Sequence, residues 1–219
     1  MELLDFARGP AITVALAIFV FGTVWRLVAL LGLPRMHDLS VPRPGTPGPL
    51  AAGAKEIFRR MWPRHEFSQS SMFAFVNGYV FHVGLAIIVF AFAPHVLFIK
   101  GLTGLHWPAL PNNVVYAIGA VTMVSLLVAL VRRMTSPVLR LISTMNDYFS
   151  WLITFAPVVT GLAAASHLGA RYETLLAIHI LSVAALFIWL PFGKLAHFFL
   201  VFISRGTTGA FMARRGIQL

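Results

Sequence analysis

The stretch 73–99 reads FAFVNGYVFHVGLAIIVFAFAPHVLFI and contains no aspartate, glutamate, lysine or arginine. About 20 mostly apolar residues suffice for a helix to cross the hydrocarbon core of a bilayer. This stretch is therefore long enough to span a membrane with tilt, or to project past it. It also contains His82 and His95. An ionisable side chain is costly within a membrane helix, so both histidines are candidate functional residues.

Four further apolar runs of spanning length occur in the chain, at 10–31, 112–131, 145–166 and 174–203. The overall composition agrees, because 58% of the 219 residues are apolar and only 11% are charged, against about 25% charged in soluble domains. The sequence therefore predicts an all-α membrane protein. We expect a five-helix transmembrane bundle that forms a single domain over residues 1–219.

The basic residues gather on one side of such a bundle. Loop 32–72, the link between the third and fourth runs, and the tail after the fifth contain Arg35, Arg43, Lys55, Arg59, Arg60, Arg64, Arg132, Arg133, Arg140, Arg205, Arg214 and Arg215. The opposite side has only Arg8, Lys100 and Arg171. By the positive-inside rule the N-terminus is expected outside and the C-terminus in the cytoplasm. This distribution explains the net charge of +10 without nucleic acid, and loop 32–72 suits a cytoplasmic partner or anionic lipid headgroups.

The chain contains no cysteine. Disulfides, covalent c-type haem and iron–sulfur ligation by this chain are thereby excluded. Four histidines lie in the second and fifth apolar runs, namely His82, His95, His179 and His197. Neutral imidazole is a suitable ligand for haem iron.

The spacing of these histidines predicts two pairs. His179 and His197 are 18 residues apart, which is five turns and about 27 Å on a continuous helix. With alternating helices, His82 and His197 share the cytoplasmic half of the membrane, and His95 and His179 the outer half. Two haems held between the second and fifth helices would use all four. The 13 residues from His82 to His95 are not a whole number of turns, so either Pro94 redirects His95 or His95 is not a ligand.

Three short sequences resemble the gamma subunit of respiratory nitrate reductases, a di-haem cytochrome b. They are FHVG at 81–84, IHIL at 178–181 and LPFGKLAH at 190–197. The resemblance implies that His82 and His197 bind the cytoplasmic haem b and that His179 binds the outer one. The family's second histidine of that helix corresponds to Phe92 here, and His95 comes one turn later. That departure favours the related cytochrome b subunits of heterodisulfide reductase-like and hydrogenase complexes.

The resemblance also implies a function. Such a subunit exchanges electrons with quinone or quinol on the outer side of a bacterial or archaeal cytoplasmic membrane. It passes them to or from a cytoplasmic iron–sulfur subunit and its catalytic subunit, and does not itself act on the terminal substrate. Lys100 and Glu173 are candidate quinone contacts at the outer side. The simpler interpretations are an interfacial lysine and an acidic residue at a helix N-terminus.

Two alternatives remain open from the sequence. One is a single-haem subunit that uses only His82 and His197, and the other is a haem-free anchor or proton relay. Gly78 and Gly84 flank His82 and favour the close approach of either a macrocycle or a neighbouring helix. Outside the apolar runs, residues 51–62 are expected to form an interfacial amphipathic helix, and Ser136 is expected to cap a helix that begins at Pro137.

Overall fold

The computed structural model describes residues 2–34, 39, 41–167 and 169–217, and these residues form helices and loops without any strand. Six helical segments of this described part are long and apolar enough to cross a membrane. They are Leu3–Leu31, His65–Ala91, Asn112–Thr135, Met145–Ser166, Tyr172–Trp189 and Lys194–Arg214. The chain is therefore a multi-pass helical membrane protein. Arg35 and His37, both in loop 32–72, lie outside the described residues.

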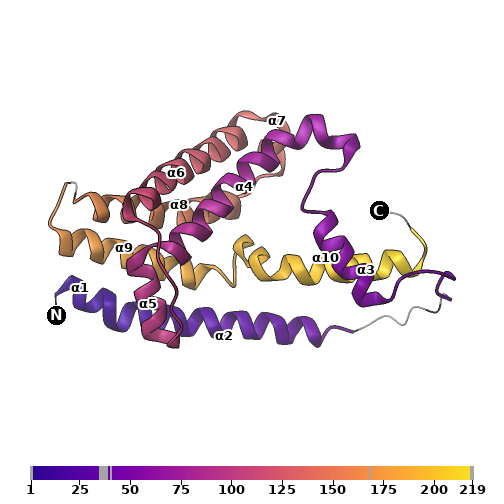
Figure 1. Cartoon of the computed structure of the whole chain (residues 1–219), viewed down its shortest axis with the longest axis horizontal. Coiled ribbons are helices and arrows are strands. Elements are labelled where there is room, and N and C mark those ends of the chain that lie inside the picture. The colour runs from indigo at the N-terminus through magenta and orange to yellow at the C-terminus, as the bar shows by residue number, and fades with distance from the viewer. Residues whose placement is uncertain (1, 35–38, 40, 168, 218–219) are drawn as a thin grey trace.

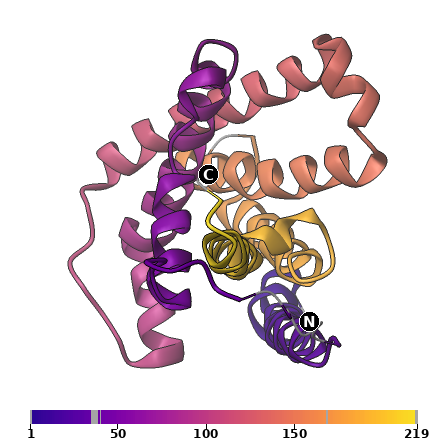
Figure 2. The same cartoon turned by 90° about the vertical axis from the view of Figure 1, so that its right-hand side faces the viewer.

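The helices pack in a continuous series. α4 (Ser68–Ala91) contacts α6 (Asn112–Thr135), which contacts α8 (Met145–Ser166), which contacts α9 (Tyr172–Trp189). α9 then packs on α2 (Ile12–Leu31). Figure 1 shows α9 and α10 (His197–Arg214) lying end to end above α2, and the view in Figure 2 places α4 and α6 to one side of them. This series brings α4 close to the last two helices.

The first apolar run begins earlier than predicted. α1 (Leu3–Phe6) and a π-helical turn (Ala7–Ala11) precede α2 in one continuous helical segment. Near the opposite end of the molecule, α3 (Pro49–Arg59) is the expected amphipathic helix, and it packs against α10. The helix that Ser136 was expected to cap is α7 (Pro137–Ile142), where the Ser136 hydroxyl accepts a hydrogen bond from the Leu139 amide. The fourth run coincides with α8.

The second apolar run is not one helix, so the prediction of a continuous helix over 73–99 was wrong. α4 ends at Ala91, Phe92 adopts an extended conformation, and α5 (Ala93–Thr103) turns away (Figure 1). Pro94 causes the break, because it has no N–H to donate to the carbonyl of Phe90. The Trp107 indole donates to that carbonyl instead, and the Leu110 amide donates to the carbonyl of Ala91 over 2.8 Å.

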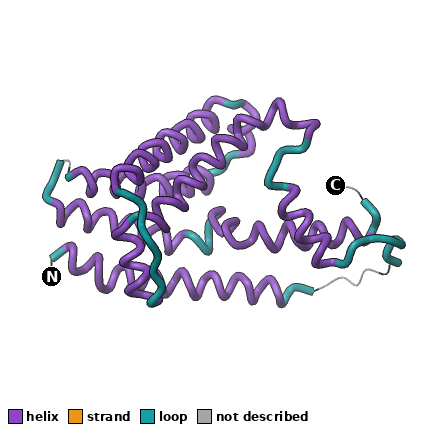
Figure 3. The backbone as a smooth tube through the Cα atoms, viewed as in Figure 1, coloured by secondary structure: helices purple, strands orange, loops and turns teal. Residues whose placement is uncertain are grey.

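The fifth run, predicted as one helix over 174–203, is also interrupted. α9 ends at Trp189, and a turn at Leu190–Gly193 and a 3₁₀ turn (Lys194–Ala196) separate it from α10 (Figure 3). Pro191 accounts for the interruption, because proline has no N–H to donate to the preceding turn and its ring crowds the carbonyl four residues before it. Gly22 of α2 leaves room for this turn, since a Cβ there would lie 2.7 Å from the ring of Pro191.

Candidate functional site: two histidine pairs

The four intramembrane histidines meet in two pairs. His82 of α4 and His197, the first residue of α10, have ring centroids 6.0 Å apart and planes at 82°. His95 of α5 and His179 of α9 have centroids 6.1 Å apart and planes at 19°. These are the pairings that the sequence predicted, although both helices that were expected to carry them are broken.

The helix break at Phe92 places His95. With α4 ended at Ala91, the carbonyl of Ile88 is available to a side chain, and Nδ1 of His95 bonds to it over 2.8 Å. The 13-residue spacing that placed His82 and His95 on different faces of a straight helix therefore does not apply. The sequence signal for this arrangement was Pro94, in the first turn of α5.

All four rings form a hydrogen bond through Nδ1. His82 bonds to the Gly78 carbonyl and His197 to the Lys194 carbonyl, both at 2.8 Å, as His95 does to Ile88. A carbonyl can only accept, so Nδ1 carries the proton in these three rings and Nε2 keeps its lone pair. Hydrogen bonding of one ring nitrogen to oxygen is the arrangement that orients histidine as a metal ligand through the other.

His179 is held by α8. Its Nδ1 lies 3.2 Å from the Thr160 hydroxyl, and that hydroxyl lies 2.7 Å from the carbonyl of Ala156, to which it donates. Thr160 oxygen is then free to accept from Nδ1 of His179, which gives the same tautomer as in the other rings. Gly161 lets the ring approach α8, because a Cβ at that position would lie 3.0 Å from Cε1 of His179.

The separation within each pair fits a metal ion between the rings. A metal–imidazole bond is about 2.0 Å long, so two imidazoles bound to one ion from opposite sides have centroids roughly 6 Å apart. Among the described residues there is no group of three or more histidine, aspartate or glutamate side chains that would hold a metal ion. The two histidine pairs therefore suit an ion whose other ligands come from a macrocycle, as in haem.

His197 is positioned by a clamp between α8 and the turn before α10. The Asn146 side chain accepts a hydrogen bond from the Lys194 amide at 3.3 Å, and Asp147 forms ion pairs with Lys194 and, at 3.0 Å, with Arg133. Asp147 also caps α8, because its carboxylate accepts from the Thr144 amide at 2.9 Å. The carbonyl that accepts from His197 thus belongs to Lys194, which α8 binds through both Asn146 and Asp147.

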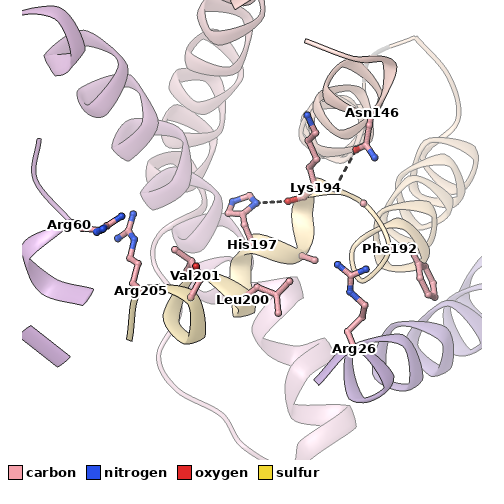
Figure 4. Close-up of a pocket in the computed structure, with 12 residues that line it drawn as sticks. Arg26, Arg60, Asn146, Phe192, Lys194, His197, Leu200, Val201 and Arg205 are labelled. Atoms are coloured by element: carbon pink, nitrogen blue, oxygen red, sulfur yellow. Dashed lines mark hydrogen bonds between the residues drawn. The ribbon is translucent and has the colours of Figure 1, made fainter. Parts of the chain in front are cut away.

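A cavity of about 600 Å³ opens beside His197. Figure 4 shows the cationic side chains around it. They are Arg26 of α2, Arg60 directly after α3, Lys194 in the 3₁₀ turn before α10, and Arg205 of α10. The volume is within the range of small-molecule and cofactor sites. Arg26 was missed as a candidate because one charge in an apolar run hardly changes its hydropathy.

The other candidates stay apart from the pairs. Lys100 in α5 is exposed, and Glu173 at the start of α9 is exposed and lies 3.8 Å from Arg171. Within the described part of the chain no hydrogen bond or ion pair joins Lys100 or Glu173 to His95 or His179. Gly84 serves helix packing, because a Cβ there would lie 2.0 Å from the Thr122 hydroxyl of α6, whereas the space beside Gly78 is open.

Comparison with known proteins gives one relative. A protein of Nitratidesulfovibrio vulgaris (strain Hildenborough) is 29% identical over 206 residues, covering 93% of this chain and 91% of the relative. It is described simply as a protein, so it contributes no activity. No protein-family model and no solved structure matches the chain. The case for a function therefore depends on the histidine pairs.

Proposed function

We propose that this chain is the di-haem cytochrome b subunit of a membrane-bound oxidoreductase. It would pass electrons between the quinone pool on the outer side and a cytoplasmic iron–sulfur partner that serves a catalytic subunit. The observation that carries the proposal is the pairing of His82 with His197 and of His95 with His179 at 6.0 and 6.1 Å. Hydrogen bonds through Nδ1 leave Nε2 of these rings available to iron.

Five crossings with the N-terminus outside agree with this arrangement. α9 and α10 lie end to end in Figure 1, so we count them as one interrupted crossing, although each is long enough by itself. Together they are longer than the hydrocarbon core of about 30 Å, so α10 would project past it on the cytoplasmic side. The N-terminus and the α8–α9 connection are at one end of the molecule, and α3 and the C-terminus at the other (Figure 1). The second end carries most of the basic residues, which favours the cytoplasm. The His82–His197 pair is then on the cytoplasmic side.

In this proposal the haem and the protein have different roles. Haem supplies one-electron transfer when it is bound. The chain supplies four imidazoles, fixes their tautomers by hydrogen bonds, and places one pair toward each side of a bacterial or archaeal cytoplasmic membrane. Because the chain contains no cysteine for iron–sulfur ligation, electrons must leave it to a partner subunit. Lys100 and Glu173 remain candidates for quinone contact on the outer side.

Haem stoichiometry tests the proposal. We would purify the chain and determine haem by pyridine haemochrome for wild type, His82→Ala, His95→Ala and, as control, His106→Ala in the exposed outer loop. We expect two haems in wild type and control and one in each of the other variants. The remaining haem would show that the variant is folded.

Two other results would change the conclusion. A single haem in wild type and in His95→Ala would favour the one-haem subunit that uses His82 and His197. No haem in wild type would contradict the cytochrome and leave the anchor or proton relay.

A further inference from the structure

The cavity beside His197 is lined by cationic side chains. Three arginines and a lysine line it, namely Arg26, Arg60, Arg205 and Lys194, together with His197, and no carboxylate lines it. The other lining residues are apolar side chains, glycine, asparagine and serine. Arg26, Arg60 and Lys194 are exposed, and positive charges gathered in this way attract an anionic ligand.

Nearby carboxylates do not supply that partner. Glu56 forms ion pairs with Arg59 at 2.8 Å and with Arg60, and Asp147 is shared between Arg133 and Lys194. Each carboxylate thus already serves two cations. Arg26 and Arg205 form no ion pair within the described residues, so the cavity has an excess of positive charge.

Arg26 is the most informative of these residues. It belongs to α2, an apolar helix of spanning length, and an arginine inside such a helix marks a functional position by default. Its guanidinium points toward the turn that precedes His197 (Figure 4). Guanidinium groups bind carboxylate or phosphate through two parallel hydrogen bonds.

We propose that Arg26 and Arg205, with Arg60, bind the two propionate carboxylates of the haem held by His82 and His197. This inference rests on the proposed function, since the anion belongs to that haem. It explains why a cationic cavity adjoins His197, because haem b carries both carboxylates on one edge. A phospholipid phosphate is the other source of the same chemistry.

The experiment compares haem with its dimethyl ester, which lacks the two negative charges. We would use the chain carrying His95→Ala, so that only the cytoplasmic site remains, strip it of haem and titrate it with each form. The unaltered cavity should prefer haem by about tenfold or more. The double variant Arg26→Gln/Arg205→Gln should lose that preference by binding haem less tightly, while Arg140→Gln, outside the cavity, should retain it.

Each failure has its own signature. A chain that takes up neither form overturns the proposed function and this inference together. If the double variant keeps the full preference for haem over its dimethyl ester, the inference is wrong and the proposed function still stands. If that variant instead loses copurifying phospholipid, assayed as phosphate, the anion at this site is a lipid headgroup.

Discussion

The imidazole of His95 lies nearly parallel to that of His179, with ring planes 19° apart. The rings of His82 and His197 are almost perpendicular, at 82°. If each pair binds a haem iron as proposed, the relative orientation of its two imidazoles determines the splitting of the iron d orbitals, so the two pairs should differ magnetically.

We predict two distinct electron paramagnetic resonance signals from the oxidised protein. The near-perpendicular pair should give a strongly anisotropic low-spin signal, and the near-parallel pair an ordinary rhombic one. His82→Ala should remove the first and His95→Ala the second. Two identical rhombic signals, with either variant halving the intensity, would contradict the ring orientations described here.

A second prediction concerns Gly161. A leucine side chain there would displace the His179 ring, because even a Cβ would lie 3.0 Å from Cε1. Gly161→Leu should reduce the haem content from two to one and spare the site at His82 and His197. Gly101→Leu is the matched control, since nothing lies within 4 Å of a Cβ at Gly101. Equal haem loss in the two glycine variants would mean that Gly161 has no specific role.

Asp147 should stabilise the His82–His197 pair without touching either ring. Asp147→Asn weakens the ion pairs with Lys194 and Arg133, and we expect a loss of about 1–2 kcal/mol because both cations are partly solvated. The melting temperature in detergent should fall by about 2–8 °C. The signal of the His82–His197 site should change before that of the other pair, since Lys194 also bonds to His197.

The control for Asp147 is Glu66→Gln. The pair between Arg64 and Glu66 is exposed and 3.8 Å long, so its loss should leave the melting temperature and both signals unaltered. A uniform loss of both signals in Asp147→Asn would indicate general unfolding rather than a specific effect on His197.

The contact between α3 and α10 should respond to acid. The Arg59 guanidinium, by hydrogen bonding to Glu56, is the main cause that lowers the pKa of this carboxyl to about 2 from 4.5. Because the folded pKa is depressed, this stabilisation is present at neutral pH and is lost as pH falls from about 4.5 to 2. The protection factors of the α3 amides, which are corrected for the pH dependence of intrinsic hydrogen exchange, should fall over that window. In Glu56→Gln the protection factors should already be low at neutral pH and should not fall further in acid.

Much of the arrangement could be predicted from hydropathy and turn counting. Each of the five apolar runs contains a helix of the structure, and α8 matches its predicted bounds, but the described residues form six candidate spans rather than five. A kink at Pro94 was one of two alternatives, and the break at Pro191 was not predicted, because apolar residues continue through Phe92 and Leu190 and the hydropathy stays high. Only Pro94 and Pro191 mark the breaks, and proline in a membrane helix does not always end it.

The candidate site was predictable for a different reason. Membrane depth follows from position along a crossing whether or not the helix is continuous, so the pairing of His82 with His197 and of His95 with His179 survived the breaks. The hydrogen-bond partners of the rings could not be predicted. One partner is the carbonyl of Ile88, which is available because α4 ends before Phe92. Another is the hydroxyl of Thr160, which belongs to a separate helix.

Each histidine pair joins α4 or α5 to α9 or α10, helices far apart in the chain. During synthesis, therefore, neither pair exists while α4, α5 and α6 are entering the membrane. Both pairs depend on helices that are synthesised after α8. His82 and His95 are therefore in the membrane before His179 and His197 have been made. If the pairs bind haem as proposed, cofactor loading is a late event in biogenesis, and a nascent chain stalled before α9 would hold no haem at either position.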